Sequence, residues 1–149
     1  MNTCESIATV DAVEYESVPV KNENIVHLPL GLLGFEHIKR YALLENPGEA
    51  PFRWLQVIDN PNLAFLVLPA LETLPDYEPD VPAEDVKFLG LKNPSDALVY
   101  NIVTLRAKGA ATLNLKGPIV INRFTLRGKQ VVLANAARYS IQHPLPLNR

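Results

Sequence analysis

Prolines divide this chain into short pieces and so limit what it can fold into. The sequence has 13 prolines and 7 glycines in 149 residues, which leaves little room for helices of several turns. The runs between these breaks are rich in Val, Ile, Leu and aromatic residues, as strands are. We predict strands at residues 13–20, 24–28, 40–44, 54–58, 64–68, 100–106, 111–115, 119–121, 124–126 and 130–134.

One short helix is predicted at residues 82–89. Pro82 suits a first helical turn, and Glu84 and Asp85 complement the dipole at a helix N-terminus. Gly90 is expected to end the helix, because glycine accepts the left-handed conformation that follows many helices.

Glycines mark two turns. Gly31 and Gly34 bracket one, and Gly128 is expected to supply the positive φ of a hairpin turn between the strands at 124–126 and 130–134. Frequent short strands with few helices predict an all-β fold, a compact barrel-like or pseudobarrel sheet with one or two short helices. We expect residues 1–12 to be a loose N-terminal leader and residues 13–149 to form a single domain.

The segment from Asn114 to Asn122 is the most distinctive strand context. Gly117 and Pro118 bend the chain ahead of the apolar run 119–121, since glycine admits backbone angles closed to other residues and proline fixes its own φ. Pro118 has no N–H for a ladder, so it belongs at the first residue of a strand or on an edge. The two asparagine side chains are predicted to hydrogen-bond neighbouring backbone and hold both ends. This segment is scaffold.

The N-terminus and the cysteine count indicate the cellular compartment of this protein. Residues 1–5 contain neither the basic nor the apolar region of a signal peptide, and a single cysteine, Cys4, excludes an internal disulfide framework. The longest apolar run, residues 63–71, contains Pro69 and is far shorter than the roughly 20 residues that cross a bilayer. We therefore expect a reduced, cytoplasmic protein that does not enter membranes.

Neither catalysis nor metal binding has a clear signature. His27, His37 and His143 show no ligand spacing, and no second cysteine is present, so we expect no metal and no cofactor. The pI of about 5.9 and the few aromatic residues in the basic C-terminal part argue against direct nucleic-acid binding. An RNA-binding barrel stays as a third alternative, and its affinity would fall steeply with salt.

Charge is distributed unevenly along the chain. All 16 acidic residues lie between Glu5 and Asp96, whereas the part from Ala97 onwards has eight basic residues and no acidic one. Strands of the two parts that alternate in one sheet would pair these charges across strands, which is the explanation we favour. The alternative is two faces of opposite sign that attract different partners.

The acidic segment, residues 72–85, is the best candidate for an interaction surface. Its carboxylates stand among three prolines that stiffen the chain, so presenting them to a partner costs little ordering entropy. Tyr77 is interpreted as an amphipathic anchor among these charges. A solvated loop that covers one end of the sheet is an equally good explanation. The candidate partner-binding residues here are Asp76, Tyr77, Glu78 and Asp80.

Several motifs together resemble the flagellar assembly factor FliW family, over roughly residues 14–145. They are Gly31-Leu-Leu-Gly34-Phe35-Glu36, residues 55–65 ending at Phe65, the block from Asn114 through Pro118 to Asn122, Gly128-Lys-Gln130-Val-Val-Leu133, and Tyr139 with Pro144-Leu145. The block 114–122 with the following Gln130 is the most specific part. The chain departs from the usual family pattern at Leu33, Val57 and Gly117, where the family has Pro, Ser and Ala.

The resemblance implies a small β-barrel-like protein with no enzymatic activity. Members of this family bind the translational regulator CsrA and relieve its repression of flagellin synthesis by a non-competitive mechanism, away from the RNA-binding surface. They also bind flagellin in a chaperone-like way, so flagellin accumulation shifts the factor between its two partners. We expect the same two partners for this chain, and a monomer.

The partner surface is predicted from charge and exposure. We place the basic partner at the acidic segment, together with Asp59 and Asn60. An amphipathic helix of flagellin would need an apolar groove, for which we consider Phe35, Phe65, Leu68 and Tyr100. The alternative function is a small ligand-binding protein or hydrolase that uses the loop aspartates Asp59 and Asp76 as an acid/base pair.

Overall fold

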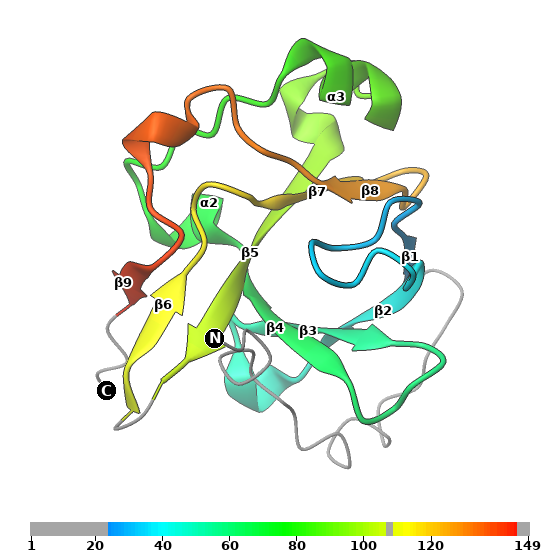
Figure 1. Cartoon of the computed structure of the whole chain (residues 1–149), viewed down its shortest axis with the longest axis vertical. Coiled ribbons are helices and arrows are strands. Elements are labelled where there is room, and N and C mark those ends of the chain that lie inside the picture. Colours follow the sequence, from blue (N-terminus) through cyan, green and yellow to red (C-terminus); the bar gives the residue numbers. More distant parts are fainter. Residues whose placement is uncertain (1–23, 107–108, 146–149) are drawn as a thin grey trace.

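The short apolar runs form one antiparallel sheet (Figure 1). The computed structural model describes residues 24–106 and 109–145. The predicted leader and the strand predicted at 13–20 lie outside the described residues. The strands are β1 (Ile25–His27), β2 (Arg40–Glu45), β3 (Arg53–Val57), β4 (Ala64–Leu68), β5 (Ala97–Leu105), β6 (Ala111–Leu113), β7 (Ile119–Asn122), β8 (Gly128–Gln130) and β9 (His143–Leu145). The helices are α2 (Ala70–Thr73) and α3 (Ala83–Leu89), with short 3₁₀ turns η3 (Pro47–Glu49), η4 (Pro94–Asp96) and η6 (Ala136–Arg138).

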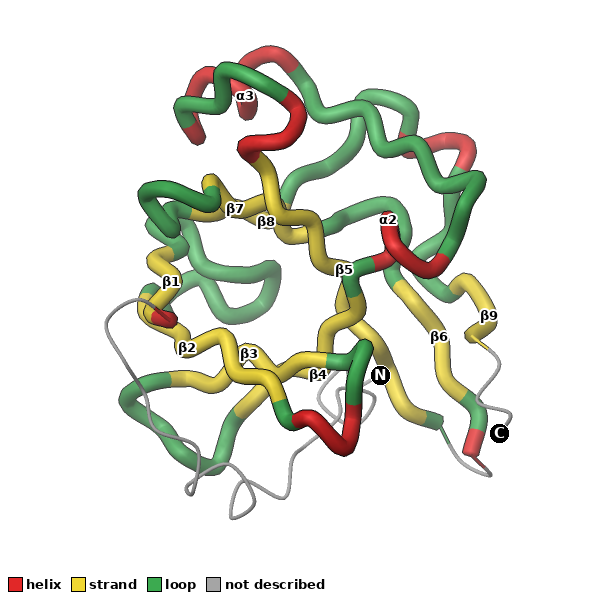
Figure 2. The backbone as a smooth tube through the Cα atoms, turned by 180° about the vertical axis from the view of Figure 1, so that it is seen from behind, coloured by secondary structure: helices red, strands yellow, loops and turns green. Residues whose placement is uncertain are grey.

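The sheet is branched at its longest strand. Its path runs β1-β2-β3-β4-β5-β6-β9, and β7 with β8 leaves this path at β5. The first half of β5 pairs with β7 and the second half with β6. The sheet curves round, but β8 approaches β1 only through a single bridge between His27 and Arg127 (Figure 2). The all-β class is therefore confirmed, and the predicted barrel-like sheet is an open one.

Two apolar cores lie on the two faces of the sheet. In β4 the side chains of Phe65 and Val67 join one core with Tyr41, whereas Leu66 and Leu68 join the other. All five residues of β4 are buried, because this strand is covered on both faces. A continuous apolar run is the sequence expected of such a strand.

The block from Asn114 to Asn122 has the structure that its sequence predicts. The Asn114 Oδ1 atom accepts the backbone N–H groups two and three residues later, at 3.1 and 3.0 Å. The Asn122 Oδ1 atom does the same at 2.9 and 3.2 Å. Pro118 directly precedes β7 and its carbonyl accepts the Val131 N–H at 2.8 Å. The predicted hydrogen bonds of both asparagines to neighbouring backbone are confirmed.

Gln130 links this block to the glycine turn at 31–34. Its Oε1 accepts the Leu33 N–H at 2.9 Å, and its Nε2 donates to the Gly117 carbonyl at 3.1 Å. Gly31 and Gly34 both have positive φ, as the turn requires. Phe35 then packs edge-on against Phe65, with ring centroids 5.1 Å apart. Residues far apart in the sequence thus share one structural unit.

The predicted hairpin around Gly128 is wrong. The observed hairpin joins β7 to β8 through residues 123–127, so Gly128 is a strand residue. The positive φ belongs instead to Leu126, at 61°. A Cβ atom on Gly128 would lie 2.8 Å from Leu28 Cδ2 and 2.9 Å from Ile121 Cγ1. Glycine is needed here because two elements approach closely.

The helix prediction is confirmed at α3. Pro82 occupies the N-cap position, and Gly90 ends the helix with φ of 69°. Helix α2 and strand β9 were not predicted. β9 contains Pro144, which lowers the strand signal of a short segment.

Acidic and basic parts do not alternate in the sheet, so the favoured explanation of the charge asymmetry is wrong. Strands β1–β4 lie together, and so do β5–β9. The β4–β5 ladder is the one extended ladder between these groups in the described sheet. Among ion pairs of the described residues, Lys129–Asp85 joins the two parts, while Arg40–Asp59 and Arg53–Glu45 lie within the first.

Candidate functional site

A surface pocket lies where the acidic segment packs against the C-terminal part of the chain. Its volume is about 650 Å³. Residues 74–77 form one wall, and Leu115, residues 138–140 and His143 form the other. We call it the tyrosine pocket, because Tyr77 and Tyr139 both line it. The lining combines apolar rings with a few polar groups, as binding pockets commonly do.

Tyr77, interpreted from the sequence as an amphipathic anchor for a partner, is buried beneath the acidic segment. Only 5% of its surface is exposed. Its hydroxyl donates to the Leu115 carbonyl at 2.8 Å and accepts from Asn101 Nδ2 at 3.0 Å. Burial raises the pKa of the phenol to about 12, although the Asn101 hydrogen bond acts in the opposite direction. Its ring meets Tyr139 edge-on at 5.0 Å, so Tyr77 supports the pocket from below.

The backbone of the acidic segment is held in place by residues 134–139. The Glu78 N–H donates to the Tyr139 hydroxyl at 3.0 Å. Asn135 holds the same stretch with both ends of its amide, donating to the Glu78 carbonyl at 2.9 Å and accepting the Asp80 N–H at 3.0 Å. The Ala134 N–H donates to the Asp80 carbonyl at 2.8 Å. These contacts fix the main chain and leave the carboxylates to solvent.

Three carboxylates of the segment face outward beside the pocket. Asp76, Glu78 and Asp80 are exposed. Within the part of the chain that the structure describes, none of them forms an ion pair. Asp85 differs, because it is buried and pairs with Lys129. Glu72 and Glu84 are exposed as well, so outward charge runs along the whole segment, and Asp76, Glu78 and Asp80 are the part of it beside the tyrosine pocket.

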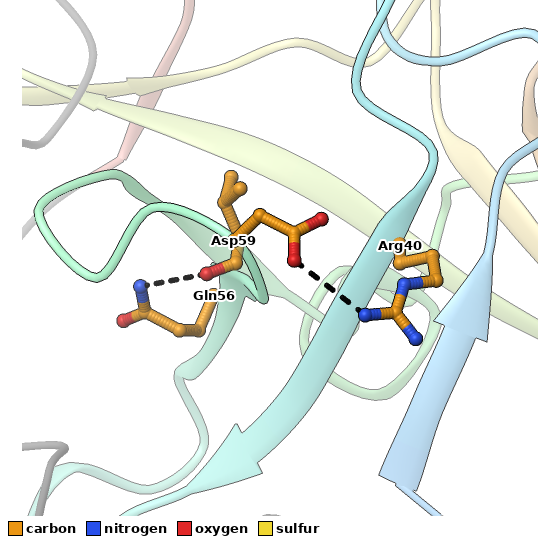
Figure 3. A network of polar contacts seen from close by, with 4 residues as sticks. Arg40, Gln56 and Asp59 are labelled. Carbon is orange, nitrogen blue, oxygen red and sulfur yellow. Dashed lines mark hydrogen bonds and ion pairs between the residues drawn. The ribbon is translucent and has the colours of Figure 1, made fainter.

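Asp59 and Asn60 lie in the turn between β3 and β4, away from the pocket. Asp59 contacts Arg40 at 3.5 Å on the surface (Figure 3), and an exposed pair of this kind contributes about 0–1 kcal/mol. The buried Gln56 holds the turn by donating to the carbonyls of residues 57, 60 and 63 at 3.2, 3.2 and 3.0 Å. Figures 1 and 2 both show this turn and the pocket segments at opposite corners of the molecule. The structure does not bring the two groups of predicted residues together.

The same separation removes the basis of the predicted acid/base pair. Asp76 lines the tyrosine pocket, whereas Asp59 does not. No group of three or more His, Cys, Asp or Glu residues with metal-binding geometry occurs among residues 24–106 and 109–145. No helix in those same ranges is long and apolar enough to cross a membrane.

The four residues that we considered for an apolar groove that binds a flagellin helix do not line one. Phe65, Leu68 and Tyr100 are buried core residues, and Phe35 is half-buried against Phe65. Their side chains fill the cores, so they do not line a surface.

Sequence reasoning missed the second wall of the pocket. Tyr139 was noted as part of a family motif, but Arg138, Asn135 and His143 were not assigned to a site. The available signal was weak: Tyr139 and Pro144 suggested a fixed C-terminal segment, and nothing in the sequence shows that this segment packs on residues 74–80.

Comparisons with known proteins agree on one family. The family model described as FliW protein matches residues 9–145. The flagellar assembly factor FliW of Treponema denticola is 38% identical over 129 residues, which cover 86% of this chain and 86% of that protein. The flagellar assembly factor FliW of Geotalea uraniireducens is 36% identical over 136 residues, 91% of this chain and 82% of the relative. A crystal structure of the flagellar assembly factor FliW superimposes with a TM-score of 0.76 at 32% identity, covering 89% of this chain and 93% of that one.

Proposed function

This chain belongs to the FliW family of flagellar assembly factors, and we propose that it acts as a protein-binding switch between the translational regulator CsrA and flagellin. Bound to CsrA, it relieves repression of flagellin synthesis by a non-competitive mechanism. Bound to flagellin, it acts as a chaperone-like partner. It works in the cytoplasm as a monomer, through binding and without a catalytic step.

The observation that carries the proposal is the set of outward carboxylates beside the tyrosine pocket. RNA-binding proteins carry basic residues, because they must neutralise phosphates. We therefore assign Asp76, Glu78 and Asp80 to CsrA, and the proposed non-competitive mechanism requires that the basic residues they contact lie outside the RNA site itself. The hydrogen bonds from Asn135 and Tyr139 hold the acidic backbone in advance, which lowers the ordering cost of binding.

A calorimetric titration against CsrA from the same organism, with flagellin as second titrant, tests the switch. We expect saturable binding to CsrA that flagellin reverses. In a separate titration of CsrA with labelled RNA, the apparent affinity for RNA is expected to fall to a plateau as this protein is added, because a partner bound outside the RNA site lowers that affinity by a fixed factor. Binding to flagellin alone would remove the regulatory arm, and binding to neither would overturn the proposed switch.

Charge reversal tests the assigned surface. The double variant Asp76→Lys with Glu78→Lys is expected to weaken CsrA binding about tenfold or more, mainly through slower association. The matched control is Asp59→Lys, which reverses an exposed carboxylate at the opposite corner. Equal losses in both variants would indicate a general charge effect, and a loss in the control alone would move the site to the β3–β4 turn.

A further inference from the structure

The β7–β8 turn, residues 123–127, exposes the most accessible large apolar side chain of the described residues. Phe124 is 74% exposed, followed by Leu33 at 70% and Val132 at 65%. Two residues later, Leu126 is half-buried and packs on the core beneath the sheet. The turn thus directs one apolar side chain inward and one outward. A phenylalanine this exposed contributes little to the core, so its ring is available for contacts with a partner.

The turn is rigid, because its backbone groups are bonded on several sides. Asn122 accepts the N–H groups of Phe124 and Thr125 through its side chain and the Leu126 N–H, at 2.8 Å, through its carbonyl. The Arg123 N–H donates to the Asp96 carbonyl at 2.9 Å. Leu126 is the one non-glycine residue with positive φ in the described ranges. Strained backbone that its surroundings hold in place is a feature of functional sites.

Two arginines flank the exposed ring. Arg123 and Arg127 are both exposed. The Arg123 Nε donates to the Ser95 carbonyl at 2.8 Å, which uses one of the five N–H donors of its guanidinium. The Arg127 guanidinium lies 4.5 Å from the centre of the Phe88 ring, a contact that leaves its edge donors available. The nearby carboxylate of Asp96 accepts the backbone N–H groups of residues 92 and 93.

We propose that the β7–β8 turn is a second docking surface, which binds an acidic protein segment whose apolar side chains cover Phe124. Aromatic residues and arginine are the residues that contribute most at protein interfaces. A rigid turn lowers the entropy cost of presenting them. Carboxylates of the segment would accept from Arg123 and Arg127. A single exposed ring does not form the series of stacking platforms that single-stranded RNA requires, so the contacts favour a protein.

The new surface is separate from the tyrosine pocket. Figures 1 and 2 show the β7–β8 turn on one side of the molecule and residues 74–80 with 138–143 on the other. An acidic segment at the turn and a basic partner at the pocket can therefore be bound at the same time. This inference stands independently of the identity of the partners proposed above.

Two model peptides of opposite charge test the proposal by NMR. One is an amphipathic peptide of Leu and Glu, and the other replaces every Glu with Lys. We expect the Leu/Glu peptide to shift the amide signals of residues 123–127 of the full chain, and the Leu/Lys peptide to leave them unchanged. No shift with the acidic peptide, or equal shifts with both, overturns the proposal. If the signals of the turn respond to an oligouridylate but to neither peptide, the surface binds RNA. If they change when the protein alone is concentrated, the surface binds a second copy of the chain.

Variants separate binding from folding. Phe124→Ala is expected to weaken the acidic peptide at least about tenfold, while the folded fraction stays unchanged because the side chain is exposed. The matched control is Val132→Ala, an exposed apolar residue outside the turn, with less than a twofold effect. Arg123→Glu with Arg127→Glu should abolish binding of the Leu/Glu peptide. Unchanged affinity of Phe124→Ala overturns the proposal, whereas failure of the CsrA titration would leave these results intact.

Discussion

Replacing Asn122 with alanine should cost about 3 kcal/mol of the free energy of unfolding, because this side chain ties three parts of the fold together. Its Nδ2 donates to the carbonyl of Leu89, the last residue of α3, at 2.9 Å. Its Oδ1 accepts the N–H groups of Phe124 and Thr125. Asn122 is buried, and so is Leu89. Water therefore cannot readily replace the bond to α3.

The magnitude follows from the burial of each partner. A buried carbonyl left without a donor costs about 2 kcal/mol, and each N–H group of the exposed turn about 0.5 kcal/mol, since water can reach it. Together these losses give about 3 kcal/mol. The variant Asn122→Asp keeps both acceptor bonds of the turn and loses the donor to Leu89. Asn122→Asp should therefore lower the free energy of unfolding by about 2 kcal/mol. It also places a carboxylate at the C-terminus of α3, where negative charge is unfavourable.

Urea titrations followed by circular dichroism and by the fluorescence of Trp54 measure these values. The slope of the free energy against urea must stay constant, so that the shift in midpoint reports stability alone. The control is Thr125→Ala, which removes one exposed acceptor of the Arg127 N–H and should cost about 0.5 kcal/mol. A loss below about 1 kcal/mol for Asn122→Ala, or a neutral Asn122→Asp, would refute the idea that the bond to α3 carries most of the effect.

Two further predictions concern the core and the alkaline range. Gly128→Ala should cost about 1–3 kcal/mol, because its Cβ would lie 2.8 Å from Leu28 Cδ2 and 2.9 Å from Ile121 Cγ1, and thermal unfolding measures the loss. An unchanged midpoint would mean that the side chains around it move freely. For Tyr77, burial raises the pKa to about 12, above the value of about 10 in the unfolded chain. The folded state then holds the proton longer, so this contribution is complete below pH 10 and is lost as the pH rises to 12. Tyr77→Phe should flatten the fall in stability between these values, and an identical pH profile would contradict the assignment.

The sheet was largely predictable where apolar runs end at turn residues. The predictions at 40–44, 54–58 and 64–68 agree with β2, β3 and β4 to within about one residue at each end. In these strands the local pattern and the final burial agree, because both faces are covered. The Asn114 and Asn122 bonds were predictable for a similar reason, since they reach only two and three residues along the chain.

The β7–β8 hairpin was not predictable, because its turn breaks a local rule. Glycine is the usual residue at positive φ, so Gly128 was taken as the turn. The structure places Leu126 in that conformation, held by core packing and by the bond to Asn122. Gly128 is required by contacts with Leu28, 100 residues away, and no local pattern contains that information.

The exposed carboxylates of the candidate site could be predicted from the sequence, but the contacts that hold the acidic segment in place could not. The exposure of Asp76, Glu78 and Asp80 follows from their polarity and from the prolines around them. The burial of Tyr77 depends on partners in β5 and in the chain after β6, and Asn135 reaches the segment from more than 50 residues away. Long-range contacts of this kind decide which residue of a loop is exposed.

The uneven distribution of charge acquires a structural meaning once the strands are placed. Because the acidic and basic parts of the chain do not alternate in the sheet, Lys129–Asp85 is the one ion pair of the described residues that joins them, and the surplus charge of each part stays on its own side. The carboxylates beside the tyrosine pocket and the arginines of the β7–β8 turn lie on opposite sides, so partners of opposite charge would be attracted to different ends. Association with both kinds of partner should then slow as salt rises, while dissociation changes little, because exposed charges act mainly on the rate of encounter.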